Sequence, residues 1–176
     1  MVELQVFISC GSEVKPLRLL AGRVLDALER SFLWGLGISI AIRNWNYEEE
    51  PPEVVAVGRF SARSLRMVDS SSAVVGILGP SVPHVTSEEI LRAIERYATG
   101  QADNVWLFLA AGTKSDDHRK FLRKIKRKTK MVAVYQEFDG DMDLQEKLFV
   151  ALTPYVIRKA ILERQTPVEA GAGGVA

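Results

Sequence analysis

The sequence has few of the residues that build cross-linked or metal-containing sites. One cysteine and two histidines occur among 176 residues, so an internal disulfide is impossible and no Cys/His cluster has metal-ligand spacing. The longest near-continuous apolar run, residues 32–42, contains two glycines and a serine. It is too short to cross a bilayer, which needs roughly 20 apolar residues. The N-terminus has no basic region typical of a signal peptide. We therefore expect a cytoplasmic protein without a membrane span.

The common nucleotide-binding and hydrolase motifs are also missing. Gly11 is a lone glycine after the first predicted strand, so neither GxGxxG nor the P-loop GxxxxGK[ST] occurs. No GxSxG elbow supports a serine hydrolase. Any chemistry on a nucleotide must therefore depend on other residues.

The net charge of +1 hides a strong segregation of charge. Residues 119–130 contain eight Lys/Arg and no acid, so the remainder of the chain carries −7. Lysines alternating with Phe121, Leu122 and Ile125 are typical of a solvated amphipathic helix. The alternative is a patch for an acidic partner or for the acidic residues 48–50 of a second copy, which would make the protein self-associate. The pattern does not favour nucleic acid, because the patch is one helix and its aromatic residue, Phe121, lies on the apolar face, where it cannot stack on a base.

Strand-like and helix-like segments alternate along the chain. The predicted strands are short and rich in Val, Ile, Leu and aromatic residues, whereas the predicted helices have apolar residues at a spacing of three and four. Thr153 and Pro154 predict either a kink or the start of a second helix in the last helical segment. The expected strands are 4–10, 38–42, 73–78, 105–110 and 131–135, and the expected helices are 14–34, 60–68, 87–98, 116–128 and 143–163.

Five apolar strands separated by helices predict an α/β fold. We expect a three-layer, doubly wound domain with a five-stranded parallel sheet and flavodoxin-like topology over residues 1–165, followed by a disordered tail, 166–176. In such sheets, ligands bind beyond the carboxyl ends of the strands, near the point where strand order switches. The segments of interest are 9–13, 43–58, 79–89 and 111–115.

Two short motifs resemble a known family. Residues 6–13, VFISCGSE, resemble the first strand and loop of Toll/interleukin receptor (TIR) domains. The third predicted strand, its Gly79-Pro80 turn and a helix that opens with Glu-Ile resemble the same domains. The segment Thr86-Ser-Glu-Glu-Ile with Ala93 is also similar to the GTxxEIGxA motif of nucleoside deoxyribosyltransferases, apart from its first glycine. The resemblance covers roughly residues 4–135 and implies a TIR-like topology.

The resemblance implies that Glu89 is catalytic, since both families use the glutamate of this motif. A carboxylate can stabilise or attack the oxocarbenium ion that forms when an N-glycosidic bond breaks. The residues themselves allow a different interpretation: Thr86-x-x-Glu89 before an apolar run is a capping box, in which both side chains satisfy backbone N–H groups. The sequence leaves these two roles of Glu89 open.

The resemblance also implies substrate-binding residues in the loops, each with an ordinary structural alternative. Small residues after the first strand can hold ribose or phosphate, or form a plain turn. An aromatic residue after the second strand can stack on a base, or fix its loop to the core. Asp69 can bind ribose hydroxyls, or end a helix. The implied set is Ser9, Cys10, Gly11, Ser12, Arg43, Trp45, Asp69, Gly79 and Thr86.

The function that the resemblance implies is cleavage of the nicotinamide–ribose bond of NAD⁺. The product would be ADP-ribose or a cyclised form, made as a signal in bacterial antiphage defence and sensed by an effector protein. NAD⁺ would be the substrate, and neither a metal nor a further cofactor is expected. Two other functions remain open: a non-catalytic TIR-like interaction module, and a nucleoside deoxyribosyltransferase-like enzyme.

Overall fold

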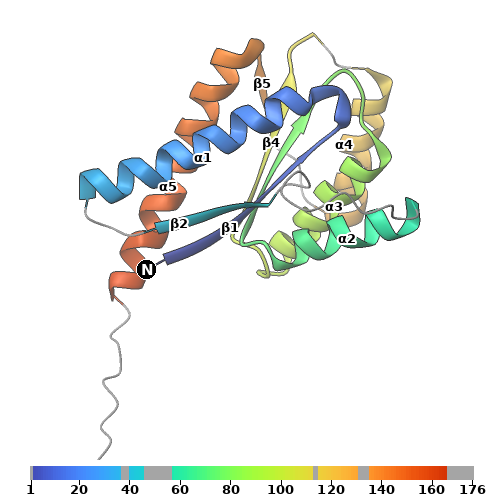
Figure 1. Cartoon of the computed structure of the whole chain (residues 1–176). Coiled ribbons are helices and arrows are strands. Elements are labelled where there is room, and N and C mark those ends of the chain that lie inside the picture. The colour runs from blue at the N-terminus through green and yellow to red at the C-terminus, as the bar shows by residue number, and fades with distance from the viewer. Residues whose placement is uncertain (1, 37–39, 46–56, 113–114, 131–134, 166–176) are drawn as a thin grey trace, which may run out of the picture.

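A parallel β-sheet forms the centre of the protein (Figure 1). The computed structural model describes residues 2–36, 40–45, 57–112, 115–130 and 135–165. Every pairing between neighbouring strands is parallel, and the strand order is β2-β1-β3-β4-β5. This order is compatible with a flavodoxin-like fold. The strands are β1 (Val2–Cys10), β2 (Ile40–Trp45), β3 (Ala73–Leu78), β4 (Asn104–Ala110) and β5 (Gln136–Phe138).

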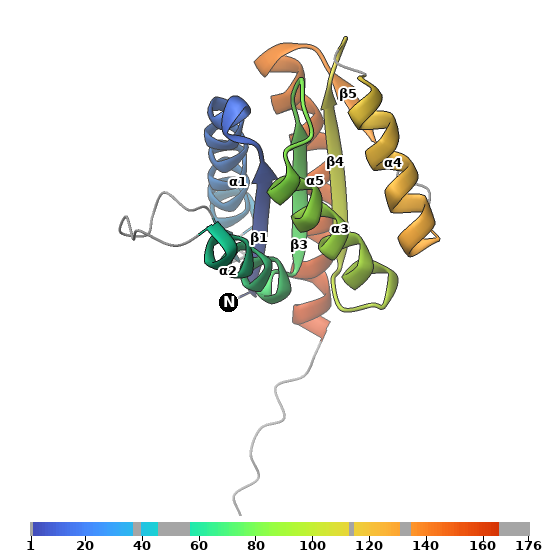
Figure 2. The ribbon, with the colours of Figure 1, turned by 90° about the vertical axis from the view of Figure 1, so that its right-hand side faces the viewer.

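Helices cover both faces of the sheet (Figure 2). One face packs against α1 and α5, and the other against α2, α3 and α4. Strand β1 shows why both faces are buried: Val6 and Ile8 point to the α1/α5 core, whereas Phe7 points to α2 and α3. The helices are α1 (Lys15–Leu36), preceded by the 3₁₀ turn Ser12–Val14, then α2 (Val57–Ser70), α3 (His84–Ala98), α4 (Asp116–Thr129) and α5 (Gly140–Gln165).

Most elements lie where the hydrophobic pattern predicts them, and β3 matches its predicted bounds. Several bounds differ from the predicted ones. Strand β2 extends to Trp45, because residues 40–45 pair with residues 2–7 of β1. Strand β5 begins at Gln136, after the predicted segment 131–135, of which 131–134 lie outside the described residues. Three helices, α2, α3 and α5, each begin three residues earlier than predicted, at Val57, His84 and Gly140.

The last helix is continuous. Pro154 lies inside α5, so of the two predicted alternatives, a kink or the start of a second helix at Thr153, the second helix is wrong. No helix in the described part of the chain combines the length and apolarity that crossing a bilayer requires. The predicted tail, residues 166–176, lies outside the described residues.

A glycine in β3 brings α3 close to the sheet. Gly76 pairs with Ser9 of β1, and a Cβ placed on Gly76 would lie 2.9 Å from Ile90 Cδ1 of α3. A larger residue at position 76 would have to displace the Ile90 side chain from this contact. Because Glu89 precedes Ile90, this close approach also places the Glu89 carboxylate above the end of β1.

Candidate active site

A cavity of about 450 Å³ opens beyond the carboxyl end of β1. This volume lies in the usual range for small-molecule sites. Strands β2 and β3 flank β1 on its two sides, so the cavity lies at the point where strand order switches. Its walls come from the β1–α1 loop, the start of α1 and the start of α3: Cys10, Gly11, Ser12, Lys15, Arg18, Pro83, His84, Val85, Thr86 and Glu89.

Glu89 contributes a buried carboxylate to this cavity. The residue is 3% exposed, and Ser9 donates a hydrogen bond of 2.5 Å from Oγ to Oε2 of Glu89. Ser9 is itself fully buried at the end of β1. A hydroxyl donor at this distance orients the carboxylate and stabilises its charge. The neighbouring Glu88 differs, because its side chain is 37% exposed and lies 3.6 Å from His84 at the surface.

The capping-box interpretation of Glu89 is wrong. The N-cap of α3 is Pro83, and the helix already includes His84, so Thr86 is its third residue and Glu89 its sixth. A capping glutamate must lie three residues after the N-cap. Thr86 is buried and lines the cavity instead. Glu89 therefore has no capping role that would explain a carboxylate at this depth.

Two cations face the same cavity from the first turn of α1. Lys15 and Arg18 lie three residues apart and both line the cavity. Arg18 donates to the Cys10 carbonyl oxygen at 2.8 Å and contacts the Cys10 sulfur at 3.2 Å. Burial raises the pKa of the Cys10 thiol, although Arg18 opposes this shift. Cys10 is thus a neutral wall of the cavity at physiological pH, as expected for a small buried hydrophobe.

Neighbouring side chains at the mouth of the cavity leave no room for a Cβ atom at position 11, which is a glycine. A Cβ at this position would lie 2.2 Å from Glu13 Oε2 and 2.6 Å from Pro83 Cγ. The carboxylate of Glu13 accepts a hydrogen bond of 2.9 Å from the Ser81 hydroxyl. The β1–α1 loop and the β3–α3 loop are thus linked directly above the sheet.

Gly79, which was expected to contact the substrate, has a structural role instead. Gly79 does not line the cavity. A Cβ there would lie 2.4 Å from Val14 Cγ1, so the glycine allows tight packing. Its carbonyl oxygen lies 3.0 Å from Nε2 of the buried His118, whose Nδ1 accepts the backbone N–H of Ser115 at 3.2 Å. Since Nδ1 accepts, Nε2 carries the proton and donates to Gly79.

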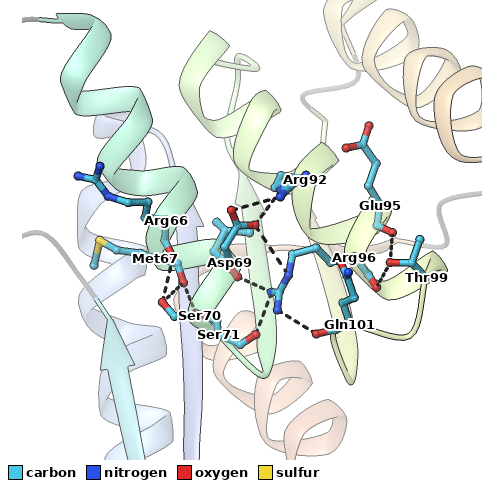
Figure 3. Close-up of polar contacts among 11 residues, drawn as sticks. Arg66, Met67, Asp69, Ser70, Ser71, Arg92, Glu95, Arg96, Thr99 and Gln101 are labelled. Atoms are coloured by element: carbon cyan, nitrogen blue, oxygen red, sulfur yellow. Dashed lines mark hydrogen bonds and ion pairs between the residues drawn. The ribbon is translucent and has the colours of Figure 1, made fainter.

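Asp69 lies at the opposite edge of the sheet, so its expected contact with ribose is wrong. The residue ends α2 just before β3, whereas the cavity lies beyond the end of β1. Figure 3 shows Asp69 facing two arginines of α3. Arg92 binds both carboxylate oxygens, at 2.7 and 3.2 Å, and Arg96 Nε lies 3.8 Å from Oδ1. Asp69 belongs to a structural ion-pair cluster.

Arg43 and Trp45 lie within a strand rather than in the predicted loop. Their backbones pair with Gln5 and Phe7 of β1, as the last part of β2. The position of Trp45 at the carboxyl end of β2 is on the same edge of the sheet as the cavity. Of the rest of the predicted loop, 43–58, residues 57–58 begin α2 and residues 46–56 lie outside the described residues.

The structure brings together five of the ten predicted site residues around the cavity and places Ser9 directly behind it. Those on the cavity wall are Cys10, Gly11, Ser12, Thr86 and Glu89. Sequence reasoning missed Lys15 and Arg18. Their signal was present: two cations three residues apart, in the first turn after the switch-point loop, lie on one face of the helix.

Comparisons with known proteins leave the family of this chain undefined. No family model and no curated protein matches it. One similar solved structure is an azoreductase from Bacillus anthracis str. Sterne, with 12% identity over 91% of this chain and 99% of that one, and a TM-score of 0.38. Similarity at this level carries no argument about activity.

Proposed function

We propose that the protein is a TIR-like NAD⁺ nucleosidase that cleaves the nicotinamide–ribose bond at the cavity beyond β1. One observation carries the proposal: Glu89 is a buried carboxylate on the cavity wall, held by a 2.5 Å hydrogen bond from Ser9, in a position where no capping role explains it. Buried carboxylates in clefts are characteristic of sites that do chemistry. The resemblance of Val6–Glu13 and Thr86–Ile90 to TIR domains supports NAD⁺ as the substrate.

The reaction that this carboxylate can support is a simple glycosidic cleavage. The bond between ribose C1′ and the nicotinamide nitrogen breaks, and its electron pair stays with the nicotinamide, which leaves as a neutral molecule. The Glu89 carboxylate stabilises the positive charge that develops on the ribose. Water then adds to C1′ and loses a proton through Glu89 to solvent. NAD⁺ and water thereby give ADP-ribose, nicotinamide and a proton.

The opposite wall of the cavity suits the diphosphate of the same substrate. Lys15 and Arg18 provide positive charge, and the N-terminal end of the helix begins at the same place. Arg18 is held in position by its hydrogen bond to the Cys10 carbonyl. NAD⁺ could bind with its glycosidic bond near the Glu89 carboxylate and its phosphates near the Arg18 guanidinium. The released ADP-ribose product, or a cyclised form, would serve as a signal for an effector protein.

The test compares two adjacent glutamates. Purified protein is incubated with NAD⁺, and nicotinamide release is followed by liquid chromatography for the wild type, Glu89→Gln and Glu88→Gln. We expect Glu89→Gln to lower the rate by at least about 100-fold, because it removes the charge that stabilises the transition state. Glu88→Gln is the matched control, since it makes the same chemical change at a half-exposed position. It should leave the rate within about two-fold, as expected for a surface substitution.

Thermal unfolding distinguishes a lost function from a lost fold. Functional carboxylates are often retained at some cost in stability, so Glu89→Gln should keep or raise the melting temperature. Absence of nicotinamide release by the wild type at high protein concentration, with and without crowding agents, would overturn the proposal. Equal rates for the wild type and Glu89→Gln would remove Glu89 from the mechanism.

A further inference from the structure

Neighbouring residues of β1 hold the two charged groups of the cavity. Ser9 donates to the Glu89 carboxylate at 2.5 Å, and the Cys10 carbonyl oxygen accepts from the Arg18 guanidinium at 2.8 Å. Consecutive Cα atoms are about 3.8 Å apart, so these two contacts place the carboxylate and the guanidinium roughly 10 Å from each other. A ligand that meets both groups must therefore carry an anionic group close to the atom that becomes positive.

One phosphorylated ribose spans this separation. Five covalent bonds of about 1.5 Å connect the C1′ carbon of a nucleotide to its 5′-phosphorus, so the two atoms lie about 6 Å apart. A contact of about 3 Å at each end completes the distance between the two protein groups. When C1′ lies at the Glu89 carboxylate, the 5′-phosphate of the same ribose reaches Arg18. The phosphate on the adenosine side of NAD⁺ lies two further bonds away.

The charge and the size of the cavity also suit one nucleotide. Arg18 and Lys15 both line it from the first turn of α1, which lies next to the carboxyl end of β1 (Figure 1). Guanidinium and phosphate groups form strong, charge-assisted hydrogen bonds. The volume of about 450 Å³ lies in the lower part of the range for small-molecule sites. A mononucleotide is about half the size of NAD⁺ and already contains every group that these walls can bind.

We propose that the cavity recognises its substrate through the 5′-phosphate of the ribose whose bond is broken, so that nicotinamide mononucleotide is a substrate as well as NAD⁺. Arg18 determines this specificity. The inference rests on the proposed function, because the reaction is the same. The bond between C1′ and the nicotinamide nitrogen breaks, its electron pair leaves with nicotinamide, and water adds to C1′ and releases a proton. Nicotinamide mononucleotide and water thereby give ribose 5-phosphate, nicotinamide and a proton.

Three nicotinamide compounds of decreasing size test the proposal on the wild-type protein. Nicotinamide release from NAD⁺, nicotinamide mononucleotide and nicotinamide riboside is followed, and the values of kcat/KM are compared. We expect the value for the mononucleotide to lie within about ten-fold of that for NAD⁺. It should exceed the value for the riboside by at least about 100-fold, because the riboside has no phosphate to accept charge-assisted hydrogen bonds.

Arg18→Met tests which residue recognises the phosphate. We expect the ratio of kcat/KM for the mononucleotide to that for the riboside to fall about 10- to 100-fold in this variant, because only the mononucleotide loses a contact. Arg23→Met is the matched control, since Arg23 is exposed on the same helix and does not line the cavity. It should keep the wild-type ratio. A partly unfolded variant lowers both rates equally, so the ratio separates recognition from loss of folding.

The possible outcomes separate this inference from the proposed function. Cleavage of NAD⁺ with the mononucleotide left intact, equal cleavage of the mononucleotide and the riboside, or an unchanged ratio in Arg18→Met would each overturn the inference and leave the nucleosidase in place. A wild type that releases nicotinamide from none of the three compounds would overturn the proposed function, and the inference with it.

Discussion

Replacement of Arg96 by methionine should cost a large part of the stability of the fold. The Arg96 side chain is buried, and its guanidinium binds the carbonyl oxygens of Val68 and Ser71 at the end of α2, the latter at 2.9 Å. It also donates to the Gln101 carbonyl at 2.8 Å (Figure 3). One arginine therefore joins the end of α2 to the end of α3 and donates to carbonyls in a region where helical donors run out.

The magnitude follows from these contacts. Hydrogen bonds to a charged donor contribute about 1.5–3 kcal/mol each, but they are not additive within one side chain. A buried carbonyl that is left without a donor costs about 1–3 kcal/mol. Since Arg96→Met removes the donor from more than one carbonyl, we expect it to lower the free energy of unfolding by about 3–5 kcal/mol. Arg96→Lys keeps the charge but not the planar set of donors, so it should recover only part of this loss.

Arg92→Met is the matched control. Arg92 also binds Asp69, but both side chains are over 40% exposed, at 46% and 41%. An exposed ion pair contributes less than about 1 kcal/mol. Urea denaturation with linear extrapolation measures both variants, with the slope checked for constancy. Similar losses below about 1 kcal/mol for both substitutions would refute the assignment of Arg96 as the link between α2 and α3.

Three further predictions concern buried polar groups. Ser9→Ala should slow nicotinamide release about 10- to 100-fold, because a charge-assisted hydrogen bond to Glu89 is lost. The control is Ser71→Ala, which removes another buried hydroxyl far from the cavity and should leave the rate unchanged. Equal effects of the two substitutions would argue against a positioning role for Ser9. The Cys10 thiol should react slowly with a disulfide reagent at pH 8 and rapidly after unfolding, since burial raises its pKa; fast labelling of the native protein would contradict this. Burial also raises the pKa of Tyr155 above its ordinary value of 10. The unfolded state therefore loses the phenolic proton first, and the free energy of unfolding should fall as pH rises above about 10. Tyr155→Phe should flatten this dependence in alkaline unfolding curves, and an unchanged slope would exclude Tyr155 as its origin.

The alternation of strand and helix was predictable because it depends on local patterns. Continuous apolar segments such as Ala73–Leu78 must be buried on both faces, and this requires a parallel sheet between two layers of helices. The location of the candidate site followed from the same argument, since ligands bind where strand order switches. The bounds of β2 and β5 were less predictable, because strand ends depend on which backbone groups find a partner in the neighbouring strand.

By itself, the sequence determined the layered α/β architecture, the edge of the sheet that holds the cavity and the segregation of positive charge onto one helix. Only the tertiary structure decided the environment of each candidate side chain. It placed Glu89 beside Ser9, 80 residues away in sequence, and Asp69 beside Arg92 at the opposite edge. The physical reason is that local periodicity fixes which face of an element is buried. Which polar groups then meet depends on contacts between elements far apart in the chain.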